Sequence, residues 1–178
     1  MLGARRVARV VAVLALVVGS SVGASTASAH EKSPWTPTGP NEDATAEACG
    51  TTLTIADVTN RVESRTVELG GGTTRTDFRG TLVVRVSALD GREAVLDNSG
   101  RYSEYDFANG DIAYDVQAPA LIYYFDDVER AAFKKAGLPP VFYYTKGRTR
   151  LYVGVDEGYE IVLQRPKDVT SVCALLKR

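Results

Sequence analysis

The chain has 178 residues, with 21 lysines and arginines, 22 aspartates and glutamates, and a single histidine. Its formal charge of −1 lacks the basic excess that nucleic-acid-binding proteins carry, so we expect no nucleic-acid partner. The lone histidine, His30, lies near the N-terminus, which leaves no base for a Ser-His-Asp or Cys-His catalytic site inside a folded domain.

Residues 1–29 have the order of a secretory signal peptide. Three arginines and no acidic residue precede an apolar run from Val10 to Val18, and Ala27-Ser28-Ala29 supplies a small-residue cleavage site. That run is shorter than the roughly 20 residues that span a bilayer. We therefore expect cleavage after Ala29 and secretion without later membrane insertion, by the general secretory or the twin-arginine route. Loss of three basic residues and no acidic one gives the mature chain a formal charge of −4.

Residues 30–48 contain three prolines and few groups to bury, which predicts a disordered leader. Trp35, the only tryptophan, either anchors a partner or packs locally. His30 would become the mature N-terminus, where its amine and imidazole could bind copper weakly, but a catalytic copper brace needs a second histidine. We therefore expect no metal and no other cofactor.

The two cysteines, Cys49 and Cys173, lie near opposite ends of the mature chain. A zinc site needs four ligands, and a redox pair would normally be Cys-x-x-Cys. Disulfides persist in exported proteins. We therefore expect a Cys49–Cys173 disulfide, which the chain-entropy model values at about 4–5 kcal/mol for so long a loop.

Residues 49–178 are expected to form one β domain, because short runs of β-branched and aromatic residues alternate with turn residues. Phe78–Ala88 shows the period-2 pattern of a half-buried strand. Asp90-Gly91 and Asn109-Gly110 are strong hairpin signals. The predicted strands are Thr51–Ile55, Arg61–Leu69, Phe78–Ala88, Tyr102–Phe107, Ile112–Val116, Ala120–Phe125, Val141–Thr145, Arg148–Val155, Tyr159–Leu163 and Thr170–Leu176.

One helix interrupts this series over Asp126–Gly137. Asp126 and Glu129 resemble a capping box, and Gly137 followed by two prolines ends the helix. Val128, Ala132 and Ala136 are expected to form its buried stripe. About 8–10 short strands with one inserted helix predict a mostly β fold, an antiparallel β-barrel or a closed sandwich.

The domain resembles a group of small exported actinobacterial β-domain proteins of unknown function. The resemblance covers most of residues 49–176 and has no diagnostic motif, so it implies no activity. By architecture alone it is similar to calycin-type and allene-oxide-cyclase-type barrels. The segments that carry it are Cys49-Gly50, Phe78-Arg79-Gly80, Ala136-Gly137-Leu138-Pro139, Thr145-Lys146-Gly147 and a cysteine near the end.

Two pairs of acidic residues offer the main alternative for chemistry. Asp111 and Asp115 lie on one strand, and Glu104 and Asp106 lie on its hairpin partner, so that their carboxylates could converge as in a glycosidase or a calcium site. The competing interpretation is that these acids form the solvent face of two strands. We assign no catalytic residue and no metal ligand.

The tyrosines are unusually frequent, nine against five phenylalanines. Inward-facing tyrosines could line a ligand cavity with an apolar wall and a few hydroxyls, or they could fill the end of the barrel under the helix and hydrogen-bond locally. The candidate ligand-binding residues are Tyr114, Tyr123, Tyr124, Tyr143 and Tyr144.

The leading hypothesis for function is a secreted, non-enzymatic binding module that holds a small apolar or amphipathic ligand inside the barrel. A histidine-independent enzyme that uses carboxylate and tyrosine chemistry, of the cyclase, isomerase or glycosidase type, is the second. A cell-envelope interaction protein that works through its outer face is the third.

Overall fold

The computed structural model describes residues 33–124, 127–154, 158–162 and 168–177, so the signal peptide predicted over residues 1–29 and His30 lie outside the described residues. The described chain is mostly β, with antiparallel strands in two sheets. The elements are β1 (Thr36–Pro37), β2 (Ala44–Ala48), β3 (Thr51–Gly70), β4 (Thr73–Ala88), β5 (Glu93–Asp97), β6 (Tyr102–Asp106), β7 (Ile112–Gln117), β8 (Ala120–Tyr123), α1 (Asp127–Lys135), β9 (Val141–Tyr144), β10 (Arg148–Gly154), β11 (Gly158–Val162), β12 (Thr170–Ser171) and α2 (Val172–Leu175).

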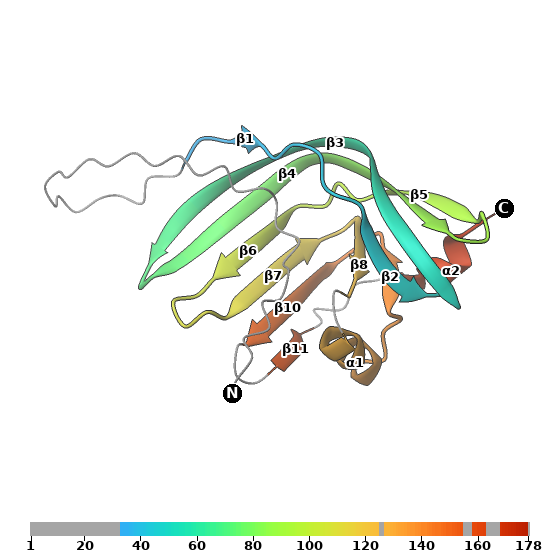
Figure 1. Cartoon of the computed structure of the whole chain (residues 1–178). Coiled ribbons are helices and arrows are strands. Elements are labelled where there is room, and N and C mark those ends of the chain that lie inside the picture. Colours follow the sequence, from blue (N-terminus) through green and yellow to red (C-terminus); the bar gives the residue numbers. More distant parts are fainter. Residues whose placement is uncertain (1–32, 125–126, 155–157, 163–167, 178) are drawn as a thin grey trace, which may run out of the picture.

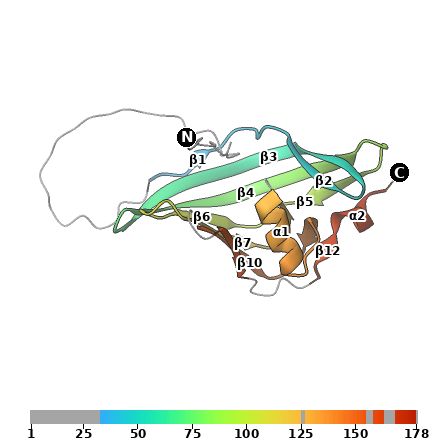
Figure 2. The same ribbon diagram turned by 60° about the horizontal axis from the view of Figure 1, so that its bottom comes forward.

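The larger sheet follows the path β1-β3-β4-β6-β7-β10-β11, and β2 and β5 add to it by pairing with β3 and β4. The smaller sheet has the order β12-β9-β8. Figure 1 shows the larger sheet curving around α1 and β8, and Figure 2 shows α1 and β12 on the same side of it. Within the described ranges no pairing joins the two ends of the path, so the structure shows antiparallel sheets and does not confirm a closed barrel.

The longest elements are β3 and β4, which pair from Leu53 opposite Ala88 to Gly70 opposite Thr73. The separate strands predicted over residues 51–55 and 61–69 are wrong, because one strand runs through both with a β-bulge at Val58. A bulge adds one unpaired residue and shifts the alternation of faces by one position. Because the alternation changes phase at the bulge, a period-2 pattern in the sequence does not reveal that the two segments form one strand.

The leader predicted to be disordered is instead ordered from residue 33 onward. β2 pairs with β3 in register from Ala44 opposite Ile55 to Ala48 opposite Thr51, and β1 pairs with the far half of β3. Ala46 and Ala48 are buried against the core. Small alanines give a weak hydrophobic signal, but they fit where an added strand completes the edge of a sheet.

The core lies between the two sheets and under α1. Phe133 of α1 is fully buried and meets Phe142 of β9 edge-on, with ring centroids 5.7 Å apart. Most of the predicted stripe is wrong: Val128 is 58% exposed, Ala136 is also exposed and Ala132 is half-buried. Glu129 and Phe133 are the buried side chains of the helix instead. The large phenyl ring therefore decides which side of the helix is buried.

Cys49 and Cys173 form the predicted disulfide, with an S–S distance of 2.07 Å and Cα atoms 5.3 Å apart. The bond joins the chain just before β3 to α2, which follows the smaller sheet, so it ties the two layers together. None of the helices in the described ranges is long and apolar enough to cross a membrane.

Candidate functional site

The two faces of the larger sheet differ sharply in composition. Along β4, the even positions Phe78, Val84, Val86 and Ala88 are buried toward α1 and the smaller sheet. The odd positions of β4 point the other way, onto what we call the outer face. Seven arginines lie on the outer face of β3, β4 and β10: Arg61, Arg65, Arg75, Arg79, Arg85, Arg148 and Arg150.

A straight row of polar residues crosses this face at one register. Arg65 of β3 lies opposite Asp77 of β4, which lies opposite Ser103 of β6. Ser103 in turn lies opposite Asp115 of β7, which lies opposite Arg150 of β10. We call these five residues the polar row. Five neighbouring strands thus present charged or hydroxyl groups side by side.

The first half of the row is centred on Asp77. Arg65 donates to its carboxylate from Nη2 at 3.1 Å, and Arg75 donates from Nη2 at 3.1 Å. The Ser103 hydroxyl donates to the other carboxylate oxygen at 2.8 Å. Partial burial alone would raise the pKa of Asp77, but the hydrogen bonds from Ser103 and Arg65 and the charge of Arg75 outweigh it and lower that pKa. The carboxylate stays ionised.

The second half of the row repeats this arrangement around Asp115. Arg148 binds this carboxylate with two guanidinium nitrogens, and Arg150 approaches it from Nε at 3.4 Å. The Asp115 side chain is 6% exposed, whereas those of Arg148 and Arg150 are 38% and 49% exposed. The carboxylate therefore lies beneath the guanidinium groups, and two arginines around one aspartate leave a net charge of +1.

Aromatic rings border the row at both ends. The Trp35 ring of the leader packs against two guanidinium groups, with its centroid 4.5 Å from Cζ of Arg65 and 4.0 Å from Cζ of Arg79. Beside β10, the Phe107 ring lies 6.5 Å from that of Tyr105 and 6.2 Å from that of Tyr152. Trp35 thus packs locally, which was one of the two alternatives for it.

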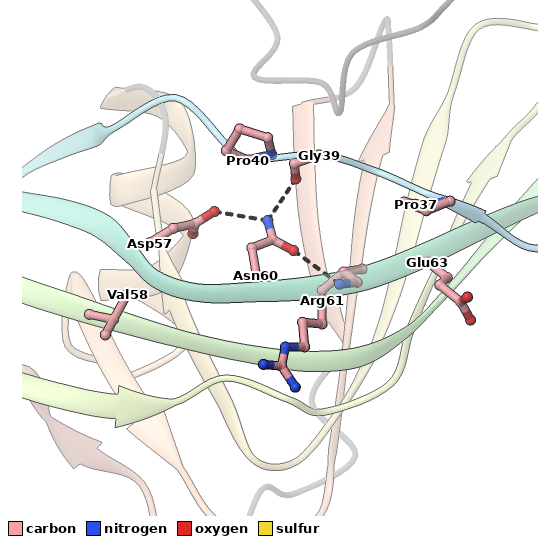
Figure 3. A pocket seen from close by; sticks show the side chains of 9 residues that line it. Pro37, Gly39, Pro40, Asp57, Val58, Asn60, Arg61 and Glu63 are labelled. Carbon is pink, nitrogen blue, oxygen red and sulfur yellow. Dashed lines mark hydrogen bonds between the residues drawn. The ribbon is translucent and has the colours of Figure 1, made fainter.

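A hollow of about 590 Å³ lies where the leader passes the β-bulge (Figure 3). Figure 3 shows Asp57, Asn60 and Gly39 joined by hydrogen bonds, and Val58 and Arg61 extending toward the neighbouring strand. The residues that line this hollow are Pro37, Gly39, Pro40, Asp57, Val58, Asn60, Arg61, Val62 and Glu63.

A second hollow, of about 440 Å³, lies against the solvent side of α1. Its walls include Arg130 and Lys134 of α1 together with Glu47, Leu138 and Pro140. Neither hollow is lined by the five tyrosines singled out in the sequence.

Three of those tyrosines connect the smaller layer to strands of the larger sheet. The Tyr124 hydroxyl donates to the Glu47 carbonyl of β2 at 2.7 Å, and that of Tyr143 donates to the Asp97 carbonyl of β5 at 2.9 Å. The Tyr144 hydroxyl donates to the Val116 carbonyl of β7 at 3.0 Å. This favours the packing interpretation for these three residues, while their role in ligand binding stays a prediction.

The other two candidates, Tyr114 and Tyr123, lie near Tyr102 on the inner side. Burial raises the pKa of Tyr102, and the charges of Glu104, Tyr114 and Tyr123 raise it further. Burial, with the charges of Asp57 and Glu129, raises the pKa of Tyr123 to about 12. The phenols of Tyr102 and Tyr123 therefore stay protonated at neutral pH.

The acidic pairs do not converge as the sequence analysis suggested. Asp115 lies on the outer face, in register with Ser103 of β6. Glu104 and Asp106 are one and three positions beyond Ser103 along β6, so their side chains fall on the opposite face of the sheet. Asp115 is bound by arginines instead. If the alternation of side chains had been followed on both strands of the hairpin together, it would have predicted that these acids lie on opposite faces of the sheet.

The arginine-rich outer face was not predicted from the sequence. Its signal is present as charges at every second position, in Arg61-x-Glu63-x-Arg65, Arg75-x-Asp77-x-Arg79 and Arg148-x-Arg150. The near-neutral total charge concealed it, because a total does not show on which face of a sheet the charges lie. In the part of the chain that the structure describes, no group of three or more His, Cys, Asp or Glu side chains could hold a metal ion.

The chain matches no protein-family model, and no curated protein or solved structure is significantly similar to it.

Proposed function

We propose that this protein is an exported, non-enzymatic binding module whose binding surface is the outer face of the larger sheet. The ligand is an anionic polymer of the cell exterior that carries carboxylate or phosphate groups. One observation carries this proposal: with Arg75 and Arg148 beside it, the polar row contains two arginine-aspartate-arginine units, each with a net charge of +1. The disulfide is the kind of bond expected in an exported protein.

The arrangement suits anion binding for a physical reason. Arginine presents a planar fork of N–H donors that matches carboxylate and phosphate oxygens. Here aspartates beneath the guanidinium groups hold them in place, which reduces the entropy lost on binding. The groups nevertheless remain partly exposed, between 24% and 49%.

The spacing of the two units sets the ligand's geometry. Asp77 and Asp115 lie on strands separated by β6, so two strand spacings, roughly 10 Å, part them. An extended polymer with anionic groups at about this interval would reach both units at once. Its backbone would then pass near the rings of Tyr105 and Tyr152, which lie in the next register row.

The proposal is tested by binding to immobilised poly-glutamate and polyphosphate, with neutral dextran as the control. At an ionic strength of about 0.01 M, where screening acts only beyond roughly 30 Å, the protein should bind both polyanions and not dextran. Binding should weaken steeply at about 0.15 M salt.

The informative variant combines Arg75→Gln with Arg150→Gln. Each substitution removes one charge and leaves its aspartate paired, Asp77 with Arg65 and Asp115 with Arg148. The double variant should bind at least about tenfold more weakly, which corresponds to about 1.4 kcal/mol. Arg85→Gln serves as the matched control and should bind the polyanions like the wild type. Arg85 lies at the other end of β4, away from the polar row, and its Nε is 3.7 Å from the Glu93 carboxylate.

Two results would contradict the proposal. One is equal binding of the wild type and the double variant when both keep the same thermal midpoint. The other is absence of binding to either polyanion at low salt. Stronger binding to duplex DNA than to both polymers would assign the face to nucleic acid instead.

A further inference from the structure

Aromatic rings lie next to the polar row on the outer face and narrow the chemistry of its ligand. We propose that the anionic polymer is an acidic polysaccharide with one carboxylated sugar in each disaccharide repeat, and that Tyr105 and Tyr152 stack on its sugar rings. This inference rests on the proposed function, because it takes the arginines around the polar row as the groups that bind the carboxylates.

Tyr105 and Tyr152 lie on the outer face, one register row beyond the polar row. Tyr105 follows Ser103 by two positions on β6, and Tyr152 follows Arg150 by two positions on β10. Both tyrosines align with Ala113 of β7, which lies between their strands in the sheet (Figure 1). Both side chains are half-buried, so part of each remains exposed to a ligand.

The two tyrosines repeat across the sheet at the same interval as the two cationic units. Tyr105 lies one strand and one row beyond Asp77. Tyr152 lies in the same relation to Asp115. Strand spacing and the rise per residue place each tyrosine backbone roughly 8 Å from that of its aspartate, and the two pairs roughly 10 Å apart. Each cationic unit therefore has a ring of its own, displaced in the same direction.

The residues between the two pairs are small. Ser103 occupies the position between the two aspartates of the polar row, and Ala113 occupies the position between the two tyrosines of the next row. No long side chain therefore stands between the pairs within these two rows. A polymer that crosses the strands can lie close to the sheet there.

The rings are supported before any ligand arrives. The Phe107 ring centroid lies 6.5 Å from that of Tyr105 and 6.2 Å from that of Tyr152, so one ring contacts both. The Tyr152 hydroxyl donates to the Asp111 carboxylate, which also accepts from Asn109 Nδ2 at 2.7 Å. A side chain that is already fixed loses little conformational entropy on binding.

Paired charges and rings fit a glycan better than other polyanions. A carboxylate accepts two hydrogen bonds from an arginine fork, and the C–H face of a sugar ring packs on an aromatic ring as other apolar groups do. Poly-glutamate and polyphosphate have no ring to stack. Single-stranded nucleic acid stacks its bases on aromatic side chains, but it has a phosphate at every nucleotide. A glycan with a uronic acid at alternate sugars has its charges at every second ring, which suits units that recur at every second strand.

The test is isothermal titration calorimetry at an ionic strength of about 0.01 M, where screening is weak. The two probes have equal numbers of carboxylates: a hyaluronate oligosaccharide, which has one glucuronate in each disaccharide, and an acetylated, amidated glutamate oligomer. The wild type should bind the hyaluronate oligomer roughly tenfold more tightly, because stacking adds to the ion pairs. A single-stranded DNA oligomer of the same charge should bind more weakly than the hyaluronate oligomer.

The informative variant combines Tyr105→Leu with Tyr152→Leu, which removes both rings and keeps apolar side chains. It should bind the hyaluronate oligomer roughly tenfold more weakly than the wild type and keep its affinity for the glutamate oligomer. Phenylalanine at both positions restores the rings and should recover most of the lost affinity. Arg85→Gln, away from both rows, is the matched control and should bind both oligomers like the wild type.

Tyr105→Leu alone leaves the hydrogen bond between Tyr152 and Asp111 in place. It should weaken hyaluronate binding by roughly threefold, and it serves as the second variant if the double variant has a lower thermal midpoint than the wild type.

The inference is overturned if the wild type binds the two carboxylate oligomers equally, or if the leucine variants keep the full preference for hyaluronate. Either result leaves binding of polyanions, and with it the proposed function, intact. Tighter binding of the DNA oligomer than of both others would assign the rings to nucleobases and also overturn the inference. Absence of binding to every polyanion would contradict the proposed function itself.

Discussion

The inner and outer faces of the larger sheet handle polar groups in opposite ways. On the inner side, the hydroxyls of Tyr124, Tyr143 and Tyr144 each end on a backbone carbonyl of a different strand, so they fix how the layers meet. On the outer side, arginines bind aspartates and keep part of their guanidinium groups in contact with water, as Arg150 does above the buried Asp115. The inner groups determine the fold, and the outer groups remain available to a ligand.

The largest expected effect concerns the bond that joins the two layers. Replacing both Cys49 and Cys173 with serine should lower the free energy of unfolding by about 4–5 kcal/mol, because the bond closes a loop between residues 124 positions apart. Urea unfolding of the wild type and the variant measures this difference. Free-thiol titration of the unfolded, unreduced wild type should find essentially no thiol. Equal unfolding midpoints would mean that the layers hold together without the bond.

The next effect contrasts the two sides of one helix. Phe133→Ala should cost about 3–5 kcal/mol, because the ring is fully buried and its loss leaves a cavity beside Phe142. Val128→Ala, on the exposed side of α1, should change stability by no more than about 0.5 kcal/mol. Denaturant unfolding of both variants checks this pair. If Val128→Ala lowered the free energy of unfolding by several kcal/mol, Val128 would have to be buried, which would contradict the orientation of α1 described above.

Much of this architecture is predictable from the sequence, and the failures have physical causes. The hairpin of β6 and β7 follows from Asn109-Gly110, and the disulfide follows from two cysteines in a chain with a predicted export signal. The inner side of α1 was not predictable from the spacing of small residues, because Phe133 buries far more area than Val128. Local periodicity counts apolar positions and does not weigh their size.

The candidate site was harder to predict, because it depends on register between strands far apart in the sequence. Arg65 and Arg150 belong to one row only because Asp77, Ser103 and Asp115 align between them. Neither composition nor spacing along one strand contains that alignment. The total charge also gives no hint of it, since a chain with a formal charge of −1 has an arginine-rich face.

Alkaline pH should act on the inner side before the outer one. Burial raises the pKa of Tyr144 to about 12, and that of Tyr123 also reaches about 12, against about 10 in the unfolded chain. Groups whose pKa is raised on folding contribute stability that is present below pH 10 and is lost as the pH rises toward 12. Phenolate absorbance should therefore lag behind that of the unfolded chain and rise together with unfolding. Ionisation of all nine tyrosines near pH 10 in folded protein would contradict this.

The smallest stability effects are expected on the outer face, where Arg75→Gln and Asp77→Asn should each cost about 1 kcal/mol or less, because partly exposed ion pairs contribute little. Their effects on binding should nevertheless be opposite. Arg75→Gln removes a positive charge and should weaken retention on poly-glutamate, whereas Asp77→Asn removes a negative one and should strengthen it. The measurement is the salt concentration that releases each protein from immobilised poly-glutamate, which should be highest for Asp77→Asn, intermediate for the wild type and lowest for Arg75→Gln.

The low pKa of Asp77 adds a pH dependence to the same pair of variants. Its carboxylate contributes stability above the unfolded value, about 3.9, and this contribution is lost as the pH falls through the lower folded value. Between about pH 5 and 8 the charge of Asp77 is therefore constant, so a difference in release between wild type and Asp77→Asn in that range reports ligand binding rather than titration. If both variants weakened retention alike, the row would act through its shape, and net charge on the outer face would not be what holds the polymer.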